Sequence, residues 1–266
     1  MSNLNKQIKV KDICDFLLEK YPLDLCSSFD MGKTGLQFGS YNKIVKKVMI
    51  TLDAASYVID EALEKNCDMI VSHHPFMFSP MLNLNYESNQ GKKMLKVFKN
   101  ELNIFAMHTN FDAAVDGMND YLATLIGLKD VKMVPDGPTA DSFMRIGKVD
   151  DIKLLDYANL IKKALGETNV RVVGDLNKII KKAAIIGGSG GLYVMDAYRN
   201  GCDVIITGEI KQNNAIDALE NGIAVIEVSH GVEANFKKYI QKMLQEEFKN
   251  VEFIISEKDV NPFKVI

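Results

Sequence analysis

Short apolar runs and amphipathic stretches alternate along the chain. Four apolar runs have the length of β-strands, at 46–52, 68–72, 182–187 and 203–207. Between the two runs of each pair lies a stretch with the apolar spacing of a helix, at 55–65 and at 191–200. Two short strands joined by one helix are typical of a βαβ unit with parallel strands. The pattern therefore predicts two such units and an α/β fold.

The two predicted units are also similar in sequence. Residues 43–72 align without a gap with residues 178–207, at an offset of 135, and nine of the 30 aligned pairs are identical. A further helix and a further strand follow in both copies, at 92–100 and 104–107 in the first and at 212–220 and 223–228 in the second. We interpret this self-similarity as an internal duplication.

The duplication divides the chain into three parts. Residues 1–128 are predicted to form the first α/β half and residues 178–266 the second, whereas residues 129–177 connect them and include part of the second half. The connection begins with a stretch rich in residues that interrupt helices and strands, namely Pro135, Gly137 and Pro138.

All four histidines of the chain follow predicted strands. His73 and His74 come directly after the second strand of the first unit, and His108 and His230 follow the next predicted strand of each half. Ligands of open α/β sheets bind beyond the carboxyl ends of the strands. A single histidine is more often a structural residue than a ligand. Four at strand ends together favour one metal site.

Carboxylates accompany two of these histidines. Asp112 follows His108 by four residues, and Glu233 follows His230 by three, so that His230 and Glu233 share one face of a helix start. Nitrogen and oxygen ligands without thiolates suit Zn, Fe, Mn or Ni. Neighbouring side chains at a strand end diverge, which favours a pair of ions about 3.5–4 Å apart, bridged by a carboxylate.

Composition and charge exclude several function classes. Hydrophobic residues make up 47% and charged residues 25%, as in folded globular proteins. Lys and Arg number 32 against 35 Asp and Glu, so no basic excess drives binding to nucleic acid. The four cysteines contain no CxxC pair, which indicates free thiols in a reducing cytoplasm.

The N-terminal residues are not a signal peptide, because charges occur throughout and Val10, Ile13 and Leu17 fall at helical spacing. No apolar run approaches the roughly 20 residues that cross a bilayer. We therefore expect a cytoplasmic protein with no membrane association.

Three weaker motifs lie near these strand ends. The glycine-rich stretch 187–191 follows a strand and opens a helix, and it is either a phosphate-binding loop or a tight strand–helix turn. Residues 35–39, GLQFG, are interpreted as a bend, with a structural role or a substrate contact as alternatives. Residues 76–90 lack clear periodicity and are candidates for a flap over the site.

The motifs resemble those of the NIF-three-like family of dinuclear-metal proteins, whose members are often called GTP cyclohydrolase 1 type 2 homologues. The resemblance covers nearly the whole chain. It rests on GLQFG at 35–39, the strand that ends in Asp53, SHHPFMF at 72–78, HTNFDAA at 108–114, GGSGG at 187–191, TGE at 207–209 and SHGVE at 229–233. It implies two intertwined three-layer α/β/α domains with mixed sheets, related by a pseudo-dyad, and a toroidal homohexamer.

The resemblance also implies roles for individual residues. The metal ligands of two divalent ions per subunit would be His73, His74, Asp112, His230 and Glu233, with Glu233 as the bridge. His108 would be a further ligand, support a ligand or contact substrate. From their positions in the chain, and not from the resemblance, we expect His108 or Glu209 to move protons in catalysis. On the same ground we expect Gly188, Ser189, Gly190 and Lys211 to contact substrate phosphates.

The chain departs from the family pattern in three places. Glu233 follows His230 by three residues where many members have four, and Lys211, Gln212 and Asn213 stand where many members carry a histidine. Residues 29–35 are longer than the usual version of this segment, which contains tryptophan, and the chain has no tryptophan.

The resemblance implies a metal-dependent hydrolase. Two ions would lower the pKa of a water molecule, and the resulting hydroxide would attack C8 of GTP, open the ring and release formate. Two alternatives remain open because family membership does not fix a reaction. One is a two-metal nucleotide phosphoesterase, and the other is a non-catalytic, metal-binding hexameric scaffold or regulator.

Overall fold

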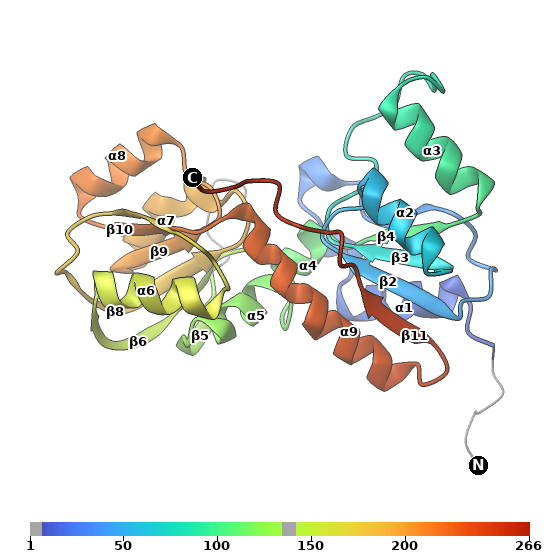
Figure 1. Cartoon of the computed structure of the whole chain (residues 1–266). Coiled ribbons are helices and arrows are strands. Elements are labelled where there is room, and N and C mark those ends of the chain that lie inside the picture. The colour runs from blue at the N-terminus through green and yellow to red at the C-terminus, as the bar shows by residue number, and fades with distance from the viewer. Residues whose placement is uncertain (1–6, 135–141) are drawn as a thin grey trace, which may run out of the picture. The chain divides into compact units, whose positions relative to one another are not determined.

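The computed structural model describes residues 7–134 and 142–266 (Figure 1). The chain forms two compact units, Met1–Phe111 with Phe236–Asn261 and Asp112–Asn235 with Pro262–Ile266. Pro135, Gly137 and Pro138, named above for the connecting segment, lie outside the described residues. Within the described ranges, no helix has the length and apolar character needed to cross a membrane.

The first unit is built on a five-stranded mixed sheet in the order β1-β4-β3-β2-β11. Its strands are β1 (Gly35–Phe38), β2 (Lys47–Thr51), β3 (Met69–Ser72), β4 (Asn103–Ala106) and β11 (Glu252–Ile255). Only β1 runs antiparallel to its neighbour. The helices are α1 (Val10–Lys20), α2 (Ser56–Glu64), α3 (Asn89–Lys99) and α9 (Phe236–Glu247), with short 3₁₀ turns η1 (Leu23–Leu25) and η2 (Ser28–Asp30).

The central strands of this sheet are apolar at nearly every position. Every residue of β3 and β4 is buried, which is typical of parallel strands covered on both faces. A core cluster around Ile59, Ile70 and Ile104 joins α2 to these strands. The packing therefore fixes the carboxyl ends of β2, β3 and β4 at one edge.

The second unit has a six-stranded mixed sheet in the order β5-β6-β8-β9-β10-β7. Its strands are β5 (Lys129–Met133), β6 (Arg145–Lys153), β7 (Arg171–Val173), β8 (Ile179–Ile186), β9 (Val204–Thr207) and β10 (Ala224–Glu227). Three of the four inner strands, β8, β9 and β10, are parallel, and the fourth, β6, runs antiparallel to β8. The helical elements are α5 (Met118–Leu125), α6 (Leu154–Ala164), η3 (Gly190–Tyr193), α7 (Val194–Arg199), α8 (Gln212–Asn221) and η4 (His230–Asn235). Helix α4 (Thr109–Ala113) contains the boundary between the units.

The two predicted βαβ units are present and match in a local detail. Asp68 Oδ2 accepts hydrogen bonds from the backbone N–H groups of residues 46 and 47, at 2.7 and 3.1 Å. Asp203 Oδ2 accepts from residues 181 and 182, at 2.8 and 3.0 Å. The same contact recurs 135 residues later and agrees with the duplication inferred from the sequence.

The structure differs from the sequence-based description at several elements. Strand β11 pairs in parallel with β2, so α9 and β11 belong to the first compact unit. The sequence-based division places them in the second half, residues 178–266. The interpretation of GLQFG as a bend was wrong, because its first four residues form strand β1. The chain bends at Gly39, with φ of 119°, where an added Cβ would lie 2.1 Å from Asn103 Oδ1.

Candidate functional site

Three histidines meet at the carboxyl ends of β3 and β4 in the first unit. The strands are parallel, and Ser72 pairs with Ala106, so the residues that follow emerge side by side. One ring nitrogen from each of His73, His74 and His108 lies within 4.8 Å of the other two. His73 is fully buried, and the other two are half-buried. Strand pairing thus brings together histidines that the sequence separates by more than 30 residues.

Each histidine of this cluster is held through Nδ1. The partners are the Met107 carbonyl for His73 at 2.9 Å, Asp53 Oδ1 for His74 at 2.9 Å and Asp30 Oδ1 for His108 at 3.0 Å. For His73 and His74 the acceptor at Nδ1 selects the tautomer with its proton there, so the lone pair lies on Nε2. The contact between His108 and Asp30 has ion-pair distance but not hydrogen-bond geometry. Metal-binding histidines are typically oriented by such contacts.

Asp30 is a functional candidate that sequence reasoning missed. It is completely buried at the end of η2, and Thr109 donates to its Oδ2 from both the backbone N–H (3.2 Å) and the hydroxyl (2.7 Å). Burial alone would raise the pKa of Asp30, but the contact with His108 and the hydrogen bonds from Thr109 hold the pKa well below its usual range. Asp30 is therefore an anion that fixes His108.

Asp53 was quoted above as a family motif, but no role was assigned to it. It is the second residue after the end of β2, so the strand-end rule that identified the histidines also applies to it. Asp30 carries no comparable local signal, because its partner lies 78 residues further along the chain.

A second group of candidate ligands lies in the second unit. His230 and Glu233 belong to η4, and His230 Nε2 lies 3.2 Å from Glu233 Oε2. His230 Nδ1 lies 2.8 Å from Glu209 Oε1, and the Ser189 hydroxyl donates to the other Glu209 oxygen. The hydrogen bond from Ser189, followed by that from His230, holds the pKa of Glu209 below its usual value. Glu209 therefore orients His230 as Asp53 orients His74.

The glycine-rich loop packs against this group. Gly188 has φ of 58°, and an added Cβ would lie 2.6 Å from Glu233 Oε1 and 3.3 Å from His230 Nε2. At Gly190 an added Cβ would lie 2.7 Å from Thr207 Oγ1, to which the Gly190 N–H donates at 2.9 Å. The close contacts at Gly190 are those of a tight strand–helix turn, one of the two alternatives above.

The remaining sequence candidates lie elsewhere in the second unit. The Asp112 carbonyl accepts from Asn119 Nδ2 at 3.1 Å, and Asn119 Oδ1 accepts from the Gly187 N–H at 2.8 Å. Asp112 is thereby tied to the start of the glycine-rich loop. Lys211 is exposed and directly precedes α8. Phosphate contacts by Gly188, Ser189, Gly190 and Lys211 stay a prediction.

The residue types in both groups fit divalent metal ions. Imidazole nitrogens and carboxylate oxygens are ligands of Zn, Fe, Mn and Ni. Among the described residues, no cysteine belongs to a group of candidate ligands. Burial raises the pKa of all four thiols, to about 12 for Cys14 and to about 11 for Cys67 and Cys202. The prediction of a nitrogen–oxygen donor set therefore agrees with the side-chain chemistry of each unit.

Comparison with known proteins identifies the family that the chain matches. A family model described as Duf34/NIF3 (NGG1p interacting factor 3) matches residues 8–262. A Clostridium perfringens protein called GTP cyclohydrolase 1 type 2 homolog is 33% identical over 265 residues, covering 97% of this chain and all of the relative. A Clostridium acetobutylicum protein of the same name is 32% identical over 266 residues, with 97% and 98% covered.

Solved structures show the same fold. A Bacillus cereus protein related to NIF3 superposes with a TM-score of 0.91 at 24% identity, covering 98% of this chain and 100% of that chain. A Staphylococcus aureus hypothetical protein gives a TM-score of 0.91 at 29% identity with the same coverage. The mixed α/β architecture is therefore shared along nearly the whole chain.

Proposed function

Because the chain belongs to the Duf34/NIF3 family, we propose that it binds two divalent metal ions and hydrolyses a nucleotide, with GTP as the first candidate. The observation that carries this proposal is the cluster of His73, His74 and His108, in which every Nδ1 lies within 3.0 Å of an oxygen atom. A purely structural histidine does not require two neighbours within ligand distance, each with its own orienting group. The relatives' name supports GTP as the substrate to test.

The proposed ligands of the two ions are His73, His74, Asp112, His230 and Glu233, with His108 as a further ligand. The chain path supports this combination. Asp112 directly follows Phe111, and Glu233 precedes Phe236 by three residues, a span of at most about 11 Å. Phe111 and Phe236 pack against the His73 ring, with centroids 6.2 and 5.8 Å away. Two boundary residues of the first unit therefore lie next to the ligand candidate His73.

The residues around the proposed ions have different roles. Divalent ions at these ligands would supply Lewis acidity and a water molecule of lowered pKa. Asp30, Asp53 and Glu209 orient histidines. We assign proton transfer to His108 and Glu209 because both lie beside ligand candidates, His108 next to His73 and His74 and Glu209 next to His230.

The test is to incubate metal-loaded protein with GTP and to measure formate and inorganic phosphate separately. Formate release supports cyclohydrolase activity. Phosphate release without formate contradicts cyclohydrolase activity and supports a phosphoesterase instead. If neither product forms, the catalytic proposal is wrong and a metal-binding scaffold takes its place. His74→Ala has to abolish the activity, whereas Asp24→Asn, at an exposed carboxylate outside the cluster, has to retain it.

We also propose a toroidal homohexamer, which the family resemblance implies. Light scattering coupled to size-exclusion chromatography measures the assembly mass directly. A mass equal to that of one chain at micromolar concentration contradicts this proposal but leaves the metal-site proposal intact.

A further inference from the structure

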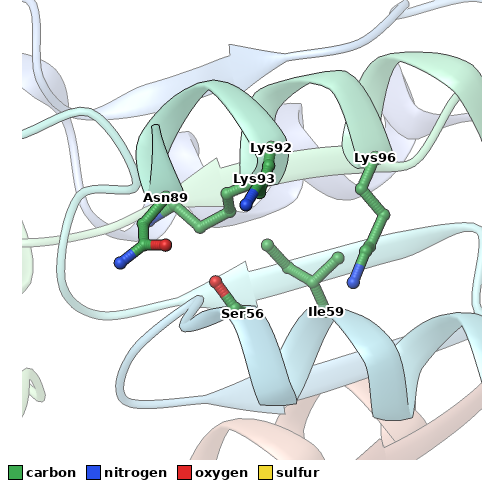
Figure 2. Close-up of a pocket in the computed structure, with 6 residues that line it drawn as sticks. All are labelled: Ser56, Ile59, Asn89, Lys92, Lys93 and Lys96. Carbon is green, nitrogen blue, oxygen red and sulfur yellow. The ribbon is translucent and has the colours of Figure 1, made fainter. Parts of the chain in front are cut away.

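A pocket in the first unit lies outside the histidine cluster, between α2 and α3. Its volume is about 220 Å³. Figure 2 shows three lysines of α3 on one side and two residues of α2 on the other. The lining residues are Ser56, Ile59, Asn89, Lys92, Lys93 and Lys96. Five of these six side chains end in polar groups, which can contact a polar ligand.

The charge in this pocket is predominantly positive. Lys96 forms an ion pair with Asp60. Lys93 is half-buried, with Nζ 4.6 Å from the Phe76 ring centroid, and burial lowers its pKa. In the portion of the chain that the structure describes, Lys96 is the one lysine of the three with an ion pair. Two ammonium groups, on Lys92 and Lys93, therefore face the pocket without a carboxylate in salt-bridge contact.

Two helices begin at the same pocket. Ser56 is the first residue of α2, and Asn89 is the first residue of α3. The residue before α2 is Ala55, which provides no side-chain hydrogen bond to the first turn. The helix starts add partial positive charge, and the Ser56 hydroxyl and Asn89 amide add hydrogen-bond donors. Figure 2 shows both residues at the end of the pocket away from Lys96.

We propose that this pocket binds a phosphate group. Lysine ammonium groups and helix starts are typical phosphate-binding partners. The pocket is smaller than the roughly 300–1,000 Å³ typical of sites for whole small molecules, so it accommodates a phosphate but not a nucleoside. An anion would also offset the cost of holding Lys93 as a cation away from water.

The position of the pocket leaves two sources for this phosphate. Ser56 follows Asp53 by three residues, Asp53 holds His74, and the negative charge of Asp53 acts on Lys93. The pocket and the histidine cluster therefore flank the same connection after β2. The phosphate belongs either to free inorganic phosphate or to a phosphorylated substrate of the histidine cluster, and the second source rests on the proposed function.

The first test is calorimetric titration of inorganic phosphate into the full-length protein at constant ionic strength. We expect saturable binding that Lys93→Met weakens by about tenfold or more, since one charge-assisted contact is lost. Lys99→Met is the matched control, because Lys99 lies on the same helix outside the pocket and should leave the affinity unchanged. Loss of binding in His74→Ala but not in Lys93→Met places the phosphate at the metal ligands and overturns the proposal.

A second measurement uses the wild-type protein, so it does not require any variant to fold. Lysine acetylation followed by mass spectrometry should show protection of Lys92, Lys93 and Lys96 by phosphate, with Lys99 unprotected. Equal acetylation of all four lysines with and without phosphate overturns the proposal.

Titration with GTP distinguishes the two sources. Weaker GTP binding in both Lys93→Met and His74→Ala assigns the pocket to a phosphorylated substrate. Phosphate binding that depends on Lys93, with GTP binding independent of it, assigns the pocket to free phosphate. Either result keeps the phosphate site, and neither depends on whether formate is released.

Discussion

The two βαβ units share a backbone framework but differ in the residues at their strand ends. In both, an aspartate carboxylate accepts hydrogen bonds from two backbone N–H groups near the start of the preceding strand. At the offset of 135, however, Asp53 corresponds to Gly188, and His74 corresponds to Glu209. The framework sets where side chains emerge, and single residues decide what they do there.

The exchanged residues take different roles around histidine. In the first unit Asp53 holds His74, which is itself a candidate ligand. In the second unit Glu209 stands at the position equivalent to His74 and instead holds His230, which comes from the next strand. The position equivalent to Asp53 is Gly188, and the space of its missing side chain lies next to Glu233. The same location thus supplies a candidate ligand in one unit and a side chain that contacts a candidate ligand in the other.

The largest expected effect separates these two roles. His74→Ala removes a nitrogen ligand, so we expect about one metal ion per chain to be lost, whereas Glu209→Gln keeps its ions at saturating metal. Elemental analysis of protein purified without a histidine tag measures both. Full metal content in His74→Ala would show that His74 is not a ligand.

A smaller effect is expected at the supporting carboxylates. Asp53→Asn and Glu209→Gln each keep side-chain shape but lose the charge that orients a histidine, so metal affinity should fall by about 10–100-fold. Competition with a chromophoric chelator gives the affinity of each variant. Asp24→Asn, on the exposed η1 turn, is the control and should not change it. Unchanged affinity in both variants would make the histidine contacts irrelevant to metal binding.

The sequence predicts the strand-end histidines well because the signal is local. β3 and β4 are short apolar runs, and the histidines directly follow them, so strand pairing was enough to bring them together. Asp30 and the edge strands β1, β7 and β11 were missed because their partners are remote in sequence. β1 and β11 each have one buried residue, Gly35 and Phe253, and β7 has none. Strand β11 also depends on pairing with β2, some 200 residues earlier.

The helices of the two units differ in a buried carboxylate. Glu61 accepts hydrogen bonds from Lys65 and Ser256 and from the backbone N–H groups of 257 and 258, whereas its equivalent, Asp196, bonds Arg199. Burial alone would raise the pKa of Glu61, but these hydrogen bonds lower it to about 2. Glu61 therefore ties the segment after β11 to α2.

Glu61→Gln should reduce the free energy of unfolding at pH 7 by about 1–3 kcal/mol. The folded-state pKa is depressed, so this stabilisation is present above the unfolded value and is lost as the pH falls from about 5 towards 2. Denaturant titrations should show that the free energies of unfolding of wild type and Glu61→Gln become more similar over that pH range. Asp196→Asn should cost less than about 1 kcal/mol, since Arg199 is largely exposed. A constant difference from pH 7 to pH 3 would contradict this account of Glu61.

The smallest effect tests the shared framework itself. Asp68→Asn and Asp203→Asn each keep one oxygen acceptor but remove the charge that two backbone N–H groups bond. We expect each to cost about 0.5–1.5 kcal/mol, because a charge-assisted contact becomes a neutral one. Hydrogen exchange of the amides of 46 and 47, and of 181 and 182, measures the loss in each unit separately.

Each of these variants serves as the control for the other. Asp68→Asn should speed exchange at residues 46 and 47 and leave residues 181 and 182 unchanged, and Asp203→Asn should do the reverse. Similar losses in both variants are what a duplicated framework requires, since the donors, the acceptor and the distances correspond. A large loss of stability in one unit and none in the other would contradict this expectation. The two contacts would then have the same geometry but contribute differently to stability.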